Sequence, residues 1–435
     1  KGGNVVDVFS GRVIKADVII KDGIICGVGS YSGENEQDVS GKYVMPGFID
    51  SHVHIESSMT QPSEYAKAVM PHGITTVIAD PHEITNVCGE DGLEFMLKSA
   101  KNIPLDVNLM LPSCVPATPF EHTGANLDAK TTQKLAPKFF GIGEMMNYPG
   151  IVSGDDETLG KLCLDIIDGH APLLSGHELD AYTSAGIKTD HECSVVEEMT
   201  EKISKGMYIL LREGTLSLDV AKLIKGVTPY TLRRCAFCTD DRFVGEIIRD
   251  GSIDHCIRKA VSLGLNNIDA IIMATLNACE MYGMKNKGAI APSYVADIVV
   301  ADDLNLSSIS QVYKNGKLVC ENGTALFECE TVDNSKVTNT VHLPKISADF
   351  FKTDVKDKFD AIELIPESII TKKVTVSYSD SLSKVCVIER HHNLGTKGIG
   401  FVTNYEITNG AIATSIGHDS HNVIVIGDND SDMAL

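Results

Sequence analysis

The sequence contains no run of basic residues, and acidic side chains outnumber basic ones. Lys and Arg together number 38 against 59 Asp and Glu, which gives a formal net charge of −21. Proteins that bind nucleic acid through its phosphates need clustered positive charge. We therefore expect no nucleic-acid partner.

Long apolar runs are also missing, because no stretch reaches the roughly 18 residues that would suggest a membrane span. The twelve cysteines are scattered singly in a chain with no signal-like start. This usage indicates reduced thiols rather than a disulfide framework. We expect a soluble, cytoplasmic protein with no membrane partner. The chain begins at Lys1 without Met and stops at Leu435 after an acidic turn, so we also expect both ends to be incomplete.

The length of 435 residues predicts at least two domains, one of which could be a barrel of about 250 residues. Residues 4–29 alternate apolar and polar positions with a hairpin turn, and a similar pattern returns at residues 297–319 around Asn315-Gly316. We expect these flanks to pair into one small β-sandwich. The predicted domains are residues 1–44 and 286–335 for the two sandwich parts, 45–285 for the barrel, and 336–435 for an α+β domain.

Between the two flanks, short β-branched runs alternate with helical patterns, which is typical of parallel βαβ units. The predicted fold class is therefore α/β, with a closed (β/α)8 barrel. Its eight strands are predicted at residues 44–53, 75–79, 107–111, 140–144, 165–170, 187–191, 207–212 and 235–240. After residue 335 the pattern indicates a Lys/Asp-rich helix, and residues 372–389 then alternate like strands.

Polar side chains follow the predicted barrel strands where each strand ends, and this face is where such barrels build active sites. His52 and His54 lie two residues apart on a strand, so both imidazoles point to the same side and could share one ion. The later strand ends carry Glu144, His170, His191 and Asp240. Such nitrogen and oxygen donors suit divalent zinc, manganese or iron, and a carboxylate between two ions keeps them close, a role we assign to Glu144.

Several motifs give these candidates a context. Pro46 to His54, together with Asp240 and the flanking β stretches, resembles the amidohydrolase superfamily. The chain more narrowly resembles the bacterial and archaeal type of adenine deaminase in Asp80-Pro81-His82-Glu83-Ile84, Gly143-Glu144-Met145-Met146-Asn147, Asp168-Gly169-His170-Ala171-Pro172, His191-Glu192, Arg212-Glu213-Gly214, Cys238-Thr239-Asp240-Asp241-Arg242 and His418-Asp419-Ser420-His421-Asn422. That family normally continues past the position of Leu435, which implies an incomplete C-terminal domain.

We expect a homo-oligomer, a dimer. The resemblance implies a purine base as substrate. It implies hydrolysis of adenine to hypoxanthine and ammonia in purine salvage, with two divalent ions, usually manganese or iron. Water activated by the metals would attack C6, and Asp240 would carry the proton toward ammonia. The implied metal ligands are His52, His54, Glu144, His170, His191 and Asp240. His177 remains an alternative to His170.

Other residues allow more than one interpretation. Asp80, His82 and Glu83 form either a hydrogen-bonded loop network, an accessory metal site or a contact to substrate. Arg212 and Glu213 form a structural ion pair, or they contact substrate or order His191. Either Glu213 or the Asp80 and Glu83 pair is expected to hold the ring nitrogens of the substrate.

The segment from His418 to His421 lies between two strand-like stretches, at residues 411–416 and 423–426. A polar turn of this kind is either a plain solvent-exposed connection or the source of a polar group for a site. We expect His418 and His421 to contact substrate if the C-terminal domain closes over the barrel mouth.

Three other functions compete with deamination of adenine. A cyclic amidase or deacetylase would share the His-x-His pair and the last-strand Asp. The zinc nucleoside-deaminase type is mimicked by Cys235 and Cys238, but Arg234 stands where that motif has proline, and these thiols are expected in the core. A non-catalytic barrel scaffold would have lost its ligands, whereas this chain retains all six.

Overall fold

The computed structural model describes residues 1–354, 357–366, 370–377 and 382–435. Within these ranges the chain forms two compact units. The first contains residues 1–81, 96–113 and 128–332, and the second contains residues 82–95, 114–127 and 333–435. The four domain limits predicted from the sequence stay predictions.

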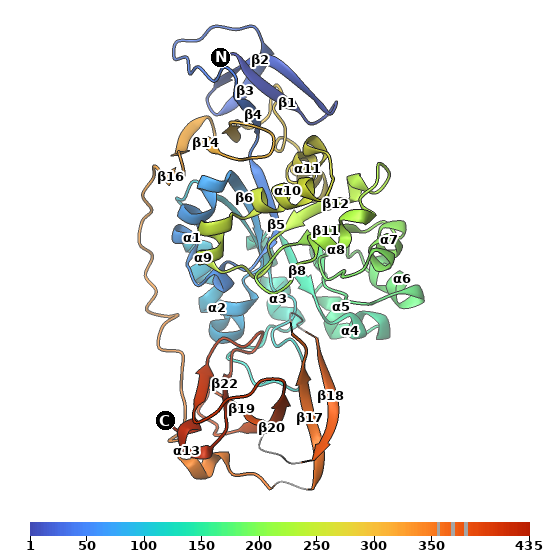
Figure 1. Cartoon of the computed structure of the whole chain (residues 1–435), viewed down its shortest axis with the longest axis vertical. Helices are drawn as coiled ribbons and strands as arrows, with labels where there is room; N and C mark the ends of the chain where they lie inside the picture. Colours follow the sequence, from blue (N-terminus) through green and yellow to red (C-terminus); the bar gives the residue numbers. More distant parts are fainter. Residues whose placement is uncertain (355–356, 367–369, 378–381) are drawn as a thin grey trace. The chain divides into compact units, whose positions relative to one another are not determined.

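Eight parallel strands in chain order form the centre of the first unit (Figure 1). They are β5 (Phe48–Val53), β6 (Ile74–Ala79), β7 (Asp106–Leu111), β8 (Gly141–Met145), β9 (Ile167–Gly169), β10 (Thr189–Asp190), β11 (Tyr208–Arg212) and β12 (Cys235–Cys238). Strands β5 to β9 and β10 to β12 pair as two sheets, and Lys188 N donates to Ile167 O between them at 3.4 Å. A parallel bridge between Val53 and Asp240 connects the last strand to the first. The predicted barrel fold is confirmed.

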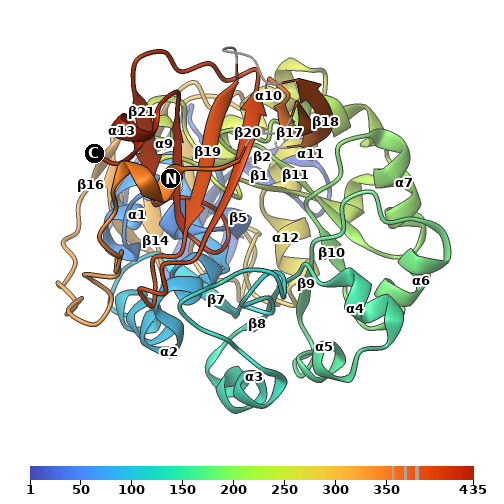
Figure 2. The same cartoon turned by 90° about the horizontal axis from the view of Figure 1, so that it is seen from below.

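Helices lie outside these strands, as Figure 2 shows for α4 to α7. The helices of the first unit are α1 (Pro62–Val69), α3 (Ala129–Leu135), α4 (Tyr148–Ser153), α5 (Asp156–Gly160), α6 (Gly176–Ser184), α7 (Val196–Ser204), α8 (Val220–Leu223), α9 (Val244–Asp250), α10 (Ile253–Ser262), α11 (Asn267–Met273) and α12 (Leu276–Met281). Helix α2 (His82–Ser99) lies mostly in the second unit. Apolar side chains of the strands, such as Ile49 and Leu210, pack with Ala278 of α12 in a fully shielded cluster. This packing holds the strand ends at fixed positions.

The prediction of one strand over residues 44–53 is wrong. The run divides at Gly47 into β4 (Tyr43–Pro46), which belongs to a different sheet, and β5. A side-chain carbon at Gly47 would lie 2.3 Å from Oγ1 of Thr75, so only glycine allows the backbone this close approach. The apolar sequence continues through the change of sheet because both strands are buried.

The two flanks of the barrel pair into one eight-stranded sheet, as predicted from their alternating patterns. Strand β4 joins them, since it pairs in parallel with β1 and antiparallel with β13. The order is β16-β15-β14-β13-β4-β1-β2-β3, in which β1 is Gly3–Asp7, β2 Arg12–Lys21, β3 Ile24–Gly29, β13 Ile298–Ala301, β14 Ile309–Lys314, β15 Lys317–Glu321 and β16 Thr324–Ala325.

The second unit contains a six-stranded sheet in the order β18-β17-β20-β19-β22-β21. Its strands are β17 (Lys358–Leu364), β18 (Thr371–Ser377), β19 (Ser383–Ile388), β20 (Lys397–Thr403), β21 (Ala411–Thr414) and β22 (Val423–Gly427), followed by helix α13 (Asp430–Met433). The expected Lys/Asp-rich helix is wrong, because a short 3-10 turn at Ala348–Phe351 precedes β17 there. Phe351 is buried against Cys386 and Ile388, so the segment is fixed by packing on the sheet.

Among the described helices, none combines the length and apolar character needed to cross a membrane.

Candidate metal centre

Six side chains from the ends of the barrel strands converge in the first unit. We call this group the barrel cluster, and it consists of His52, His54, Glu144, His170, His191 and Asp240. Nε2 of His52 lies 3.2 Å from Nε2 of His54, and the His54 nitrogen lies 3.1 Å from Oδ1 of Asp240. The rings of His52 and His191 stack with centroids 4.1 Å apart. The sequence therefore predicted a set that the fold does bring together.

Backbone pairing between the first and last strands positions His52, His54 and Asp240. Asp240 N donates to the carbonyl of His52 at 3.0 Å, and His54 N donates to the carbonyl of Asp240 at 3.3 Å. Asp240 itself has φ 56°, a left-handed conformation that Asp tolerates better than most residues. This turn out of β12 carries the Asp240 carboxylate toward the two imidazoles of β5.

The two oxygens of Glu144 face two different groups of histidines. Oε1 lies 3.3 Å from Nε2 of His54 and 4.0 Å from Nε2 of His52. Oε2 lies 2.6 Å from Nδ1 of His170 and 3.2 Å from Nε2 of His191. Because one carboxylate reaches both groups, the arrangement suits two cations with Glu144 between them.

The donor set fits divalent metal, and His54 shows why. Its Nδ1 lies 2.8 Å from the carbonyl oxygen of Asp80, so Nδ1 carries the hydrogen and donates it. In the neutral ring, Nε2 then presents a lone pair toward the carboxylates of Glu144 and Asp240. A lone pair that faces two anions needs a positive charge between them. A backbone acceptor on the other ring nitrogen is also the usual partner of a metal-binding histidine.

The electrostatics of the cluster also favour bound cations. Burial, together with the neighbouring His191, lowers the pKa of His52 to about 3, which leaves its imidazole neutral. Burial lowers the pKa of His191 as well, but hydrogen bonding and the charge of Glu144 raise it to about 9. Burial raises the pKa of Glu144, yet the adjacent His170 and His191 hold it well below the usual value. The site thus places two ionised carboxylates, Glu144 and Asp240, among side chains that are buried, apart from His170, whose side chain is 25% exposed.

Asp80 follows β6 and contacts the backbone of Glu144. Its Oδ2 accepts a hydrogen bond from the backbone N of Glu144 at 2.9 Å. A side-chain carbon at Gly143 would lie only 2.1 Å from the same oxygen. Glycine at position 143 is therefore what lets the Asp80 carboxylate reach the strand that carries Glu144.

Arg212 contacts the barrel cluster through Asp240. Its Nη1 donates to Oδ2 of Asp240 at 2.9 Å, and its Nε donates to Asp219 at 3.2 Å. The guanidinium is held by Asp240, Asp219 and Glu192. Glu192 in turn lies 3.6 Å from Nε2 of His191, so the expectation that Arg212 and Glu213 order His191 stays a prediction. A planar donor with several N–H groups fixes a carboxylate in orientation as well as in charge.

Glu213 lies apart from the six in its contacts. Its Oε1 accepts a hydrogen bond from Lys259 and lies 3.9 Å from Nε2 of His255. Its Oε2 is buried and accepts no hydrogen bond within the described part of the chain. One carboxylate oxygen therefore remains available to a donor from outside the protein.

The structure separates the two candidate histidines near the fifth barrel strand. His170 follows β9 and contacts Glu144, as described above. His177 lies in α6 with a fully exposed side chain, 3.6 Å from Asp180. Only His170 of these two reaches the barrel cluster.

Two acidic residues near the cluster, Glu192 and Asp241, were not predicted from the sequence as site residues. Glu192 pairs with Arg212 and lies 3.6 Å from Nε2 of His191. Asp241 groups with His54 and Asp240 among side chains that could hold a metal ion. Glu192 directly follows His191, and Asp241 directly follows Asp240. This adjacency is the one feature of the sequence that could have indicated their place in the site. Neighbours in sequence at a strand end, where the chain turns, can both face the same site.

The remaining predicted residues gather in the second unit. We call this group the C-terminal cluster, and it consists of Glu83, His418 and His421. One oxygen of Glu83 pairs with Nδ1 of His418 and the other with Nε2 of His421. Burial raises the pKa of Glu83, but His82, His418 and His421 lower it well below the ordinary value. These residues therefore share contacts with one another, in a group of their own.

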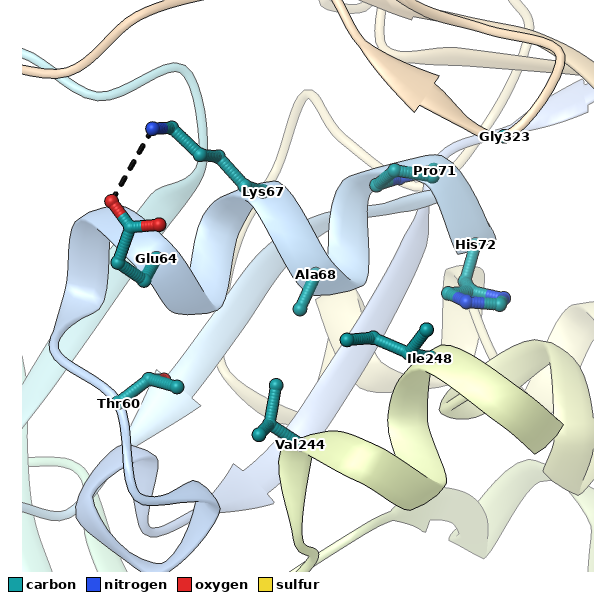
Figure 3. A pocket seen from close by; sticks show the side chains of 9 residues that line it. All are labelled: Thr60, Glu64, Lys67, Ala68, Pro71, His72, Val244, Ile248 and Gly323. Atoms are coloured by element: carbon teal, nitrogen blue, oxygen red, sulfur yellow. Dashed lines mark ion pairs between the residues drawn. The ribbon is translucent and has the colours of Figure 1, made fainter.

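A surface pocket elsewhere in the first unit has a different character. Figure 3 shows it between α1 and α9, lined by Thr60, Glu64, Lys67, Ala68, Pro71, His72, Val244, Ile248 and Gly323. Lys67 and Glu64 form an ion pair at 3.3 Å across one turn of α1. The lining includes none of the residues predicted for catalysis or metal binding.

The sequence of this chain matches two models of known protein families and several known relatives. Residues 43–319 match the family model described as "Amidohydrolase family", and residues 364–435 match "Adenine deaminase C-terminal domain". An adenine deaminase of Clostridium acetobutylicum is 48% identical over all of this chain and 80% of its own length. An adenine deaminase of Nitratidesulfovibrio vulgaris is 44% identical over all of this chain and 79% of its own length.

Solved structures show the same fold at low sequence identity. A beta-aspartyl dipeptidase from Fervidobacterium islandicum superimposes with a TM-score of 0.54 at 19% identity, over 77% of this chain and 97% of that one. An enamidase superimposes with a TM-score of 0.54 at 17% identity, over 76% of this chain and 98% of that one. At these identities the likeness concerns the fold alone.

Proposed function

This chain belongs to the amidohydrolase family, and we propose that it hydrolyses adenine to hypoxanthine and ammonia. Relatives that match the whole chain are adenine deaminases, and the C-terminal match is specific to that group. The chain also retains a full set of nitrogen and oxygen donors in its barrel. A barrel scaffold that had lost its chemistry would have no reason to keep these donors in a buried site.

The observation that carries the proposal is the position of Glu144 between two groups of histidines. His52, His54 and Asp240 would hold one divalent ion, and His170 and His191 would hold the other. Bound metal lowers the pKa of water and so supplies a nucleophile at neutral pH. We propose that both ions are manganese or iron, with zinc as the alternative.

Asp240 is the proposed proton carrier. Its carboxylate is buried, and Arg212 together with His52 and His54 keeps its pKa well below the usual value despite the opposing effect of burial. The group is therefore ionised and able to accept a proton when a nucleophile attacks C6 of the purine. It would then deliver that proton to the departing amine nitrogen. Arg212 fixes the direction of the carboxylate during both transfers.

Glu213 is the proposed contact to a ring N–H of the substrate. Its free Oε2 is an acceptor buried among protein atoms, and a buried acceptor without a donor is costly unless a ligand supplies one. Asp80 holds the backbone of Glu144 through Oδ2, which makes it a positioning residue, and its role as a contact to substrate stays part of the proposal. His191 is proposed as a metal ligand.

The experiment is an assay of ammonia release by the manganese-loaded chain. Adenine, adenosine and guanine would be compared at equal concentrations, and turnover of dihydroorotate, whose ring opening releases no ammonia, would be followed by the loss of its ultraviolet absorbance. We expect adenine to give the highest kcat/KM, since the relatives are named adenine deaminases and adenine is the free base. Faster turnover of adenosine would refute the choice of substrate, and faster turnover of dihydroorotate would indicate a cyclic amidase instead.

The setting we propose is purine salvage in the cytoplasm by a homodimer. The measurement for the dimer is the molar mass in solution by light scattering. A monomeric mass at micromolar concentration with full activity would contradict that part of the proposal.

A further inference from the structure

The C-terminal cluster combines residues that are far apart in the sequence. Glu83 lies in the first turn of α2, and His418 and His421 lie in the turn between β21 and β22. The carboxylate of Glu83 is buried, the His421 side chain is 12% exposed, and the His418 side chain is 38% exposed. The cluster is thus a partly open site with an ionised carboxylate at its base.

The turn that carries both histidines is fixed by other contacts. His421 N donates to the carbonyl of Gly417 at 2.7 Å. The side chain of Asn422 donates to the carbonyl of His122 at 2.8 Å, and Nε2 of His391 lies 2.8 Å from the carbonyl of Ser420. The imidazoles therefore face Glu83 from a backbone that is held in place independently of them.

Two further donors lie at the edge of the cluster. Nε2 of His82 is 3.2 Å from Oε1 of Glu83 and 3.6 Å from Oδ1 of Asp419. Three imidazoles and two carboxylates are thus available within two short segments of chain. Structural sites for zinc use four protein ligands in a tetrahedral arrangement, and imidazole and carboxylate are both suitable donors.

Protonated histidines would explain the cluster less well than a cation. For each carboxylate oxygen to receive a charged donor, His418 and His421 would both carry a positive charge with ring centroids 5.4 Å apart. With His82 adjoining the same carboxylate, three imidazoles compete for one Glu83. Neutral imidazoles around one divalent ion avoid that repulsion, and the charges of Glu83 and Asp419 together balance the ion.

We propose that Glu83, His418 and His421 bind a divalent transition-metal cation of the zinc class, with His82 or Asp419 as the fourth ligand. Ligand atoms of the first three residues lie within 4.8 Å of one another, a spacing that one ion can serve. The site shares no residue with the barrel cluster and does not depend on the proposed deamination. Its effect would be structural, because the ion would tie the start of α2 to the β21–β22 turn.

The test is the number of zinc equivalents bound by the whole chain. Protein stripped with a chelator would be dialysed against Zn²⁺ and measured by elemental analysis. We expect the wild type to bind one equivalent more than the double variant His418→Ala/His421→Ala. His177→Ala is the matched control, because that histidine is exposed and should leave the count unchanged.

A second variant guards against misfolding of the first. Glu83→Gln keeps the shape of the side chain and removes its charge, and it should also bind one equivalent fewer than the wild type. Co²⁺-loaded wild type should show visible absorption that falls in both variants but not in His177→Ala. Equal metal content in the wild type and both variants would overturn the proposal. This holds even if the variants lose activity toward adenine. The count is independent of that activity, so failure here leaves the proposed function standing.

Discussion

The barrel cluster and the C-terminal cluster use similar side chains but obtain their geometry differently. The six barrel residues come from five strand ends, and hydrogen bonds between strands fix the backbone on which they stand. The C-terminal cluster depends on one helix turn and one hairpin turn. His52 is 0% exposed, whereas the His418 side chain is 38% exposed. A rigid, dry scaffold can support chemistry, while a turn-borne, wetter site is better suited to holding segments together.

The largest effect should follow from removing the proton carrier of the barrel cluster. Asp240→Asn should reduce kcat for adenine about a thousandfold, within the range of 10² to 10⁴ typical of a lost general base. Asparagine tolerates the left-handed backbone at this position, so the fold should be retained. Steady-state kinetics and circular dichroism would measure both. A kcat within tenfold of the wild type would remove Asp240 from the proton path.

The exposed carboxylate of Asp302 provides a control for this substitution. Asp302 pairs with Lys42 at the surface, at 2.9 Å. Asp302→Asn should leave kcat unchanged, since the residue has no contact with the barrel cluster.

Removing the shared carboxylate should weaken metal binding in one cluster only. Glu144→Gln should lower manganese affinity at the barrel by at least about tenfold, since losing even an outer hydrogen-bond partner of a metal ligand costs 10- to 100-fold. The zinc equivalent assigned to the C-terminal cluster should remain. Metal titration followed by elemental analysis would separate the two effects. Unchanged manganese affinity would show that Glu144 does not bridge.

Asp254 is a buried carboxylate outside both clusters, and its partners are groups of the protein. Its substitution therefore measures the effect of losing a buried carboxylate that is not proposed to bind metal. Asp254 accepts hydrogen bonds from Arg258 at 2.7 Å and from Ser252 N at 2.7 Å, and it lies 3.2 Å from Nδ1 of His72. Asp254→Asn should lower the free energy of unfolding by about 3 kcal/mol, because it leaves buried partners unpaired. Chemical denaturation with and without metal would show the same loss. A loss that appeared only in metal-loaded protein would contradict this assignment.

The contribution of Asp254 to the free energy of unfolding should also depend on pH. Burial raises the pKa of Asp254, but hydrogen bonding with His72 and the nearby Arg258 lower it below the ordinary 3.8. A folded-state pKa below the unfolded one stabilises the protein above about pH 4, and the contribution is lost as pH falls through the folded value. Stability of the wild type should therefore fall more steeply below pH 4 than that of Asp254→Asn. Parallel curves would contradict the low pKa.

The smallest effect is expected at the surface pocket of Figure 3. Lys67 pairs with Glu64 at 3.3 Å and with the exposed Glu328 at 3.5 Å. Exposed pairs contribute about 0–1 kcal/mol, so Lys67→Ala should leave thermal stability, metal content and kcat close to those of the wild type. A tenfold change in kcat would show that this pocket takes part in catalysis.

Much of the barrel could be predicted from sequence because its signals are local. The two-residue spacing of His52 and His54 reports directly on strand geometry, and Glu144 and Asp240 follow apolar runs that end where the site is. The family resemblance added the identity of the reaction. Neither signal depends on contacts between distant residues.

The errors arose where tertiary packing decided the outcome. Gly47 separates two buried strands of different sheets, but the apolar run through it continues unbroken. The segment before β17 has a helical composition, yet Phe351 packs on a sheet and fixes a short turn instead. The pairing of Arg212 with Asp240 could not be read from spacing, because the two lie on different strands.

The bridge between Val53 and Asp240 has a consequence for the order of events during synthesis. The first strand of the barrel leaves the ribosome long before the strand that closes it. At about 5–20 residues per second, the interval between these two positions is roughly 10 to 40 s. During that time His52 and His54 lack their closing partner, and the nascent chain must keep its first strands from pairing with other molecules. The complete set of six donors, Asp240 included, exists only after this delay, at the end of barrel translation rather than at its beginning.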